Sequence, residues 1–219
     1  MLKKIGSMAA ILLTAAHTWA QAEEAPLSEQ LDGLEPRARL AYVRHLISQG
    51  RDDPEVFFQA AVAFHELGVV DSALHYYSYT IVRDPENYKA YVNKGVLLDD
   101  TGDYPGALQN FAMAVAVKPD DVLAHSHLAF LLFENSDYQG AWSHLSRALE
   151  IDPDHPQARF YLAIFFWESR IYREAIREWE KVIELEPRGF LAAKARENIV
   201  MLQNALNSPA GSSEWEPER

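Results

Sequence analysis

The chain of 219 residues contains no cysteine. Disulfides, thiolate zinc sites, cysteine nucleophiles and a lipidated N-terminal cysteine are therefore excluded. Basic residues are also scarce, because 20 lysines and arginines stand against 32 aspartates and glutamates, for a formal net charge of −12. Such a chain repels phosphate groups, so we expect neither a nucleic acid partner nor binding to anionic lipid.

Long hydrophobic runs are missing as well. The apolar stretch at 8–16 is well short of the roughly 20 residues that a membrane-spanning helix needs. Two lysines precede it, and Ala20 and Ala22 follow in an A-x-A arrangement. This pattern is typical of a signal peptide, here residues 1–22, cleaved after Ala20 or Ala22, with an uncleaved anchor as the alternative. In a Gram-negative bacterium the product, without a membrane span, would be periplasmic.

Motifs of catalysis and of cofactor binding are also lacking. The sequence has no glycine-rich phosphate loop, no G-x-S-x-G and no alternation of aromatic and basic residues. His125 and His127 are two apart, so on a helix they point to different faces and make a poor metal pair. We therefore expect a protein that is not an enzyme, with no catalytic residue, no metal site and no cofactor.

What the sequence does contain is a period of 34 residues. It is visible first in the prolines that stand at Pro85, Pro119, Pro153 and Pro187. Two columns of small residues have the same period: Ala61, Gly95, Ala129, Ala163 and Ala73, Ala107, Ala141, Ala175. Two columns of large apolar residues accompany them: Phe64, Leu98, Leu132, Phe166 and Tyr77, Phe111, Leu145, Trp179. Five columns in register indicate an internal repeat.

Each period holds two helical patterns, for example 88–100 and 104–117, with Gly102 at the turn between them. Small side chains let the two helix axes approach closely, and the large columns fill the space around that contact. Proline ends the second helix because it lacks an N–H and disfavours helical angles in the residue before it. The N-cap positions of the following helices fall on Asn87, Asp121 and Asp154.

This pattern resembles the tetratricopeptide repeat (TPR) family, whose 34-residue helix-turn-helix units stack into a right-handed superhelix. The resemblance covers residues 54–189 and implies an all-α, right-handed superhelical solenoid. Its complete repeats are 54–87, 88–121, 122–155 and 156–189.

The remaining segments fit the same scheme. Residues 37–53 are predicted to form an N-terminal capping helix, and 190–206 an amphipathic C-terminal capping helix. Such caps cover the apolar ends of a repeat array. We expect residues 23–36 to be a flexible linker and 207–219 a disordered tail.

A second apolar stripe lies on the first helix of each repeat, beside the residues that the repeat needs for packing. Its members share a face because they are three, four or seven residues apart. Hydrogen-bonding side chains accompany it. The candidate groove residues are Phe58, Val62, Val92, Asn93, Val96, His127, Phe130, Phe133, Phe160, Tyr161, Ile164 and Trp167.

The resemblance implies that this stripe faces the concave surface, where the family binds peptides. The family's best-known groove grips a peptide carboxylate with basic residues and asparagines. Here Asn93 matches that pattern, but Phe58, Leu123 and His127 stand where lysine or arginine would be needed. We therefore expect the groove to take an apolar or amphipathic segment of a partner protein.

The alternative is that the stripe is internal filler, covered by neighbouring repeats or by the protein's own N-terminal segment. A set of carboxylates near the groove end of the first helices would select basic residues in a ligand, or would simply be solvated: Asp99, Asp100, Glu134 and Glu168. The function that we expect is a non-enzymatic adaptor or scaffold of the bacterial cell envelope. A self-assembling oligomer that forms a structural platform is the alternative.

Overall fold

The computed structural model describes residues 26–207. Within that range it contains eleven α-helices and no strand. The expected signal peptide, 1–22, lies outside the described residues, as does the expected tail beyond Asn207. The chain divides into two compact units, which meet in sequence between Glu86 and Asn87.

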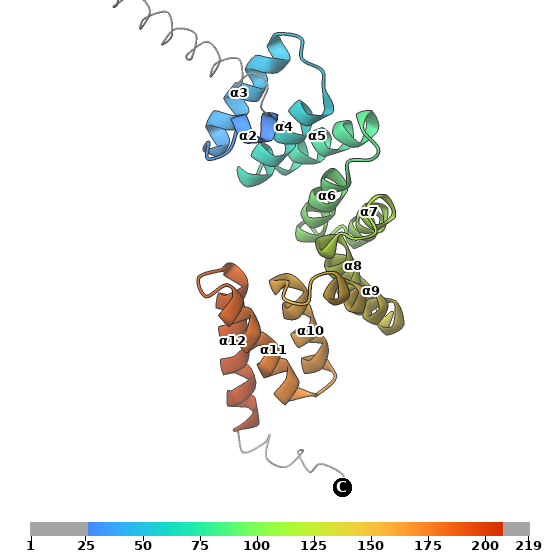
Figure 1. Ribbon diagram of the computed structural model, residues 1–219, viewed down its shortest axis with the longest axis vertical. Helices are drawn as coiled ribbons and strands as arrows, with labels where there is room; N and C mark the ends of the chain where they lie inside the picture. Colours follow the sequence, from blue (N-terminus) through green and yellow to red (C-terminus); the bar gives the residue numbers. More distant parts are fainter. Residues whose placement is uncertain (1–25, 208–219) are drawn as a thin grey trace, which may run out of the picture. The chain divides into compact units, whose positions relative to one another are not determined.

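The first unit comprises the four helices up to residue 86 (Figure 1). Its helices are α2 (Leu27–Gln30), α3 (Pro36–Ser48), α4 (Pro54–Glu66) and α5 (Val70–Arg83). The α4–α5 hairpin is the first 34-residue repeat, and α3 packs against α4. Helix α3 is the capping helix that the sequence predicts within 37–53.

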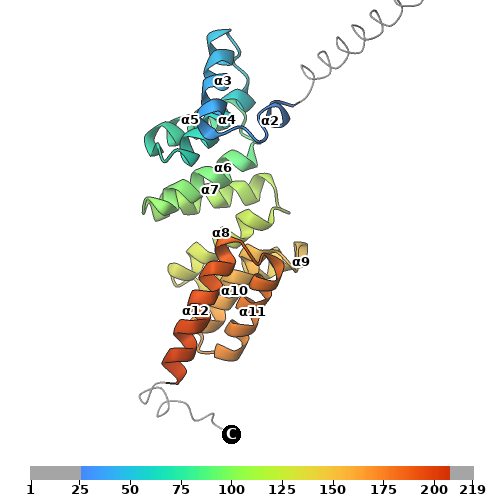
Figure 2. The ribbon, with the colours of Figure 1, turned by 90° about the vertical axis from the view of Figure 1, so that its left-hand side faces the viewer.

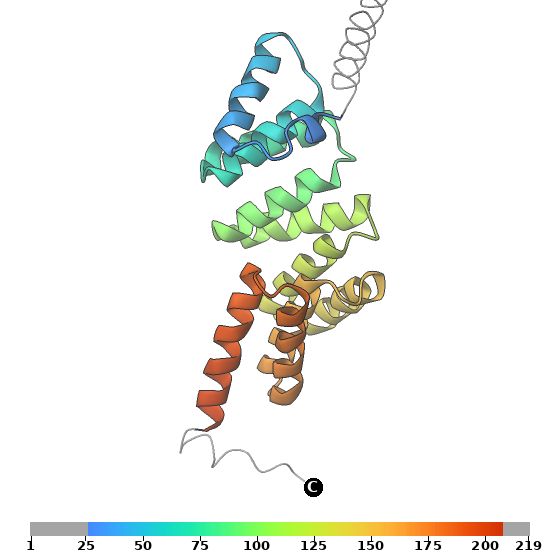
Figure 3. The ribbon, with the colours of Figure 1, turned by 60° about the vertical axis from the view of Figure 1, so that its left-hand side comes forward.

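The second unit holds three hairpins and a final helix (Figure 2). Its helices are α6 (Tyr88–Asp100), α7 (Tyr104–Val117), α8 (Val122–Glu134), α9 (Tyr138–Ile151), α10 (Pro156–Glu168), α11 (Tyr172–Leu185) and α12 (Phe190–Leu206). Successive hairpins contact one another through α7 and α8 and through α8 and α10. Helix α12 lies alongside α11 (Figure 3), with the bounds that the sequence predicts. The expected all-α repeat fold is confirmed.

The columns of small residues lie where the paired helices meet. All eight of their members are buried, and the large column Tyr77, Phe111, Leu145, Trp179 is fully buried. At Gly95 the two helices approach so closely that an added Cβ would lie only 2.8 Å from Phe111 Cε1. The two helices of this hairpin can therefore pack at their observed distance only because Gly95 has no side chain.

Two of the predicted N-caps are observed. The backbone N–H of Ala90 donates to the Asn87 side chain over 3.1 Å, and that of Ala124 donates to the Asp121 carboxylate over 2.9 Å. Each cap satisfies one of the N–H groups that a helix leaves unpaired at its start.

The third predicted N-cap, Asp154, is wrong by one residue. Helix α10 begins at Pro156, so that His155 is its N-cap, and His155 makes no capping hydrogen bond through its side chain. Proline suits the first helical position because its missing N–H would have no partner there. The Asp154 carboxylate instead accepts a hydrogen bond from Arg159 over 3.0 Å.

The predicted linker at 23–36 is corrected by the structure at α2. Leu27 and Leu31 are only 5% and 1% exposed, and they pack with Val43, Leu46 and Val56. These leucines cover the apolar face that α3 and α4 present, which a flexible segment could not do. Residues 27–31 are therefore part of the N-terminal cap.

Candidate protein-binding surface

The candidate groove residues are divided between the two units. Phe58 and Val62 lie on α4 in the first unit, and the other ten lie on α6, α8 and α10 in the second. Phe58, Val92 and Phe160 are buried, with 8%, 6% and 9% of their surface exposed. The other nine are half-buried. We call the ten residues of the second unit the first-helix stripe.

Aromatic members of the first-helix stripe contact one another across repeats and also contact buried rings of the second helices. The rings of Phe130 and Tyr161 stack at 4.7 Å between centroids. His127 stacks on Phe111 at 4.9 Å, and its Nδ1 shares a hydrogen bond with the Tyr161 hydroxyl over 3.2 Å. Trp167 meets the buried Trp179 edge to face, with centroids 5.9 Å apart. One side of the stripe thus holds α8 and α10 together.

These contacts leave almost no free space in the part of the α8–α10 interface where Phe130 and Tyr161 lie. The gap beside Phe130, Tyr161 and Ile164 has a volume of about 10 Å³, which is too small for a ligand group. The stripe therefore serves the packing between repeats through its inner side. A ligand can meet only the outer, half-exposed side of these side chains, and their role in binding stays a prediction.

The polar pair in the stripe is electrically neutral at neutral pH. Burial, and secondly the nearby His155, lower the pKa of His127 to about 4. Burial also raises the pKa of Tyr161 well above its usual range. Because neither group is charged at pH 7, the stripe offers a partner aromatic surface with hydrogen-bonding groups and no ion pair.

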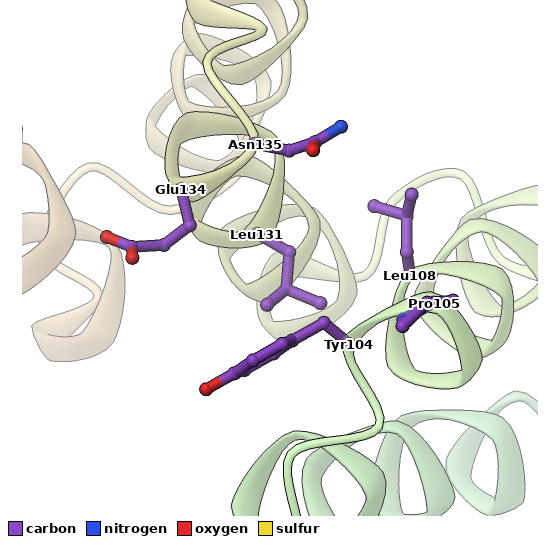
Figure 4. A pocket seen from close by; sticks show the side chains of 6 residues that line it. All are labelled: Tyr104, Pro105, Leu108, Leu131, Glu134 and Asn135. Carbon is purple, nitrogen blue, oxygen red and sulfur yellow. The ribbon is translucent and has the colours of Figure 1, made fainter.

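Two open pockets lie at one end of the hairpins of the second unit. The first has a volume of about 460 Å³ and is formed by α7 and α8 (Figure 4). Its apolar lining comes from Tyr104, Pro105, Leu108 and Leu131, while Glu134 and Asn135 extend to opposite sides of the end of α8.

The second pocket has a volume of about 600 Å³ and lies where α8, α9 and α10 meet. Phe133, Tyr138 and Phe165 form its aromatic wall, and the ring of Phe133 lies 5.4 Å from that of Tyr138 and 4.6 Å from that of Phe165. Phe133 is the predicted groove residue that lines an open pocket of this size. Glu134 lines both pockets.

Comparison with known protein families decides which family the fold belongs to. The tetratricopeptide repeat family matches residues 58–122 and 132–199, which together make up more than half of the chain. The chain is a member of the tetratricopeptide repeat family. No curated protein matches the sequence.

Solved TPR structures share the fold at low sequence identity. TTC0263 from Thermus thermophilus is 21% identical, with 77% of this chain and 91% of that chain covered and a TM-score of 0.62. The MamA 41-end fragment from Desulfovibrio magneticus RS-1 is 22% identical, with 75% and 93% covered and a TM-score of 0.61. YrrB, described as a TPR protein with an unusual peptide-binding site, is 18% identical, with 84% and 97% covered and a TM-score of 0.57.

Sequence reasoning missed the two pockets at the end of the TPR hairpins, although a signal was present. Tyr104 and Tyr138 stand 34 residues apart at the start of the second helices, and they are 61% and 57% exposed. Two exposed tyrosines that recur with the repeat offer ring surface beyond what the packing of the repeat buries. This column therefore marked the edge of the TPR units where the pockets lie.

Carboxylates surround this edge, as the sequence suggested. Glu134 and Glu168 line the pockets. Burial raises the pKa of Asp99, and the negative charges of Asp100 and Glu134 raise it further. These charges are thus close enough to act on one another, and they make the end of α6 and α8 negative.

Other kinds of site are not found in the part of the chain that the structure describes. Among residues 26–207 no three histidine, aspartate or glutamate side chains could hold a metal ion together. No helix in the same range is long and apolar enough to cross a membrane. The TPR fold is typical of scaffolds that bind other proteins.

Proposed function

We propose that the chain is a non-enzymatic adaptor that binds an apolar or amphipathic segment of a partner protein on the first-helix stripe of its second unit. The single observation that supports this site is that seven of the ten stripe residues have apolar or aromatic side chains that are only half-buried, so that each offers surface to a partner. Covering that surface would contribute about 25 cal/mol for each Å² removed from water, before the cost of association. The peptide-binding site of YrrB, which has the same fold, supports a peptide as the ligand.

The proposal includes export to the periplasm and a role in an envelope complex. Its support is the pattern of a signal peptide, in which two lysines precede the apolar stretch at 8–16, and Ala20 and Ala22 follow it. Mass spectrometry of the chain isolated from the source cells would show an N-terminus at Gln21 or Glu23. A chain that retains Met1 would argue for an anchor or for no export.

The binding site is tested by affinity capture from periplasmic extract with Val96→Ser and Phe130→Ser combined. Both residues belong to the stripe, and neither lines the two open pockets. The matched control combines Met113→Ser and Val200→Ser, which change exposed apolar residues outside the stripe. Circular dichroism establishes that both proteins are folded.

We expect the stripe variant to lose at least about ten-fold in affinity for the captured partner, or about 1.4 kcal/mol, and the control to bind as wild type does. Equal capture by both proteins would contradict the assignment of the stripe. Sedimentation of the purified chain distinguishes the self-assembling alternative, because an adaptor without its partner should be monomeric at micromolar concentration.

A further inference from the structure

The two open pockets are copies of one site, related by a single TPR unit. Adding 34 to the numbers of four of the six lining residues of the first pocket gives lining residues of the second. The pairs are Tyr104 and Tyr138, Leu131 and Phe165, Glu134 and Glu168, and Asn135 and Ser169. Each pocket thus has an exposed tyrosine, an apolar floor, a carboxylate and an uncharged polar group.

The carboxylates determine which charge a ligand of these pockets should carry. Glu134 lies between the pockets, because it lines both of them, and Glu168 belongs to the far side of the second. Glu134 forms no ion pair with any residue in the described range 26–207. A lysine or arginine of a ligand, placed between the pockets, could therefore pair with the Glu134 carboxylate without breaking an existing ion pair.

The distance between the pockets determines which backbone can reach both. They are one repeat apart: the first lies at α7 and α8, and the second lies at α8, α9 and α10. Packed helix axes, such as those of α8 and α10, are about 8–10 Å apart. Residues seven apart on a helix lie on one face and are separated by about 10.5 Å. In an extended strand, side chains on one face recur at about 6.6 Å and 13 Å, and both values are further from the spacing of packed helices than 10.5 Å is.

We infer that the two pockets together form a docking surface for an amphipathic helix of a partner protein. The helix would insert large apolar side chains seven residues apart, and would place a lysine or arginine between them, three or four residues from the first, against Glu134. This inference rests on the proposed adaptor function and adds a second contact surface, at the end of the hairpins, with a defined sequence requirement.

The probe for this inference is a synthetic 18-residue alanine-based helical peptide with capped ends. It carries leucines seven residues apart and an arginine midway, and a control peptide has glutamate in place of the arginine. Binding to the full chain is followed by amide chemical shifts in ¹H–¹⁵N spectra. We expect saturable shifts that centre on Tyr104, Leu131, Tyr138 and Phe165, and affinity at least about five-fold lower for the control peptide.

Variants of the chain locate the binding. Glu134→Gln should weaken binding of the arginine peptide about five-fold and should strengthen binding of the glutamate control peptide, because it removes a like charge. Glu197→Gln on the exposed face of α12 should change neither. Tyr104→Ser with Tyr138→Ser should weaken both peptides, and it should not unfold the chain because both tyrosines are mostly exposed. Shifts that do not saturate, or equal affinity in wild type and Glu134→Gln, would overturn the inference.

The captured partner distinguishes the two proposals. If it binds the Tyr104→Ser, Tyr138→Ser chain as well as wild type but fails on the Val96→Ser, Phe130→Ser chain, the pocket inference is wrong and the stripe proposal stands. If the partner binds the Val96→Ser, Phe130→Ser chain as well as wild type but fails on the Tyr104→Ser, Tyr138→Ser chain, the pockets bind the partner and the stripe proposal is wrong.

Discussion

Gly95 shows how a single residue fixes the distance between two helices. The other repeats have alanine in this column, but an added Cβ at Gly95 would lie 2.8 Å from Phe111 Cε1. The phenyl ring cannot move aside freely, because it is fully buried and stacks on His127. In the third repeat the column holds Ala129, which has a Cβ, and the large residue in the same core cluster is Leu145, which is smaller than phenylalanine.

We predict that Gly95→Ala destabilises the second unit by about 1–2 kcal/mol, although alanine favours a helix by about 1 kcal/mol over glycine. Chemical denaturation measures the change. In a Phe111→Leu background, which copies the third repeat, the same substitution should cost at least about 1 kcal/mol less. Equal costs in the two backgrounds would show that Phe111 is not the obstacle.

His127 makes stability depend on pH. Its folded-state pKa is lowered to about 4, chiefly by burial, so between pH 6.5 and pH 4 the unfolded chain binds a proton that the folded chain does not. This contribution to stability is therefore complete above pH 6.5 and is lost as the pH falls toward 4.

The corresponding prediction compares the free energy of unfolding at pH 7 and pH 4.5. The wild-type chain should lose about 2 kcal/mol more than His127→Gln over this interval. His144, whose pKa burial also lowers, contributes equally to both proteins. His75→Gln, at an exposed position, should behave as wild type does. An identical loss in His127→Gln and wild type would contradict the account.

At the scale of elements, the helix pairs could be predicted from the sequence because each has a physical signature. Small residues at a fixed period mark the crossing of two helices, and proline marks where the second helix ends. Helix α2 has no such signature, because it has only four residues and follows the segment that resembles a signal peptide. Its burial depends on the tertiary fit of Leu27 and Leu31 and not on a periodic pattern.

The contribution of α2 can be measured with Leu31→Ala. Because Leu31 is 1% exposed, its loss should destabilise the first unit by about 2–4 kcal/mol. Leu34→Ala, three residues on and 38% exposed, should cost less than about 0.5 kcal/mol. Hydrogen exchange of α3 and α4 amides reports on this unit by itself. Equal protection of these amides in the two variants would contradict the packing of α2 and would support the original prediction of a flexible linker.

At the scale of the molecule, the site was harder to predict than the fold. The stripe on the first helices was visible in the sequence, but its double role was not, because contacts such as Phe130 with Tyr161 depend on how repeats stack. The pockets at Tyr104 and Tyr138 were missed because each is assembled from two or three helices. The sequence showed Glu134 and Glu168 as charges near the ends of the first helices, but only the structure places them beside the apolar floors of the pockets.

On the scale of the whole chain, we predict that the second unit binds a partner where the stripe meets the open pockets. The most direct test is photo-crosslinking in the source cells, with a photoreactive residue in place of Phe133 and, as the control, of the exposed Met113 on α7. We predict that one discrete protein is trapped from position 133 and not from position 113. The same product from both positions, or none from position 133, would contradict the claim.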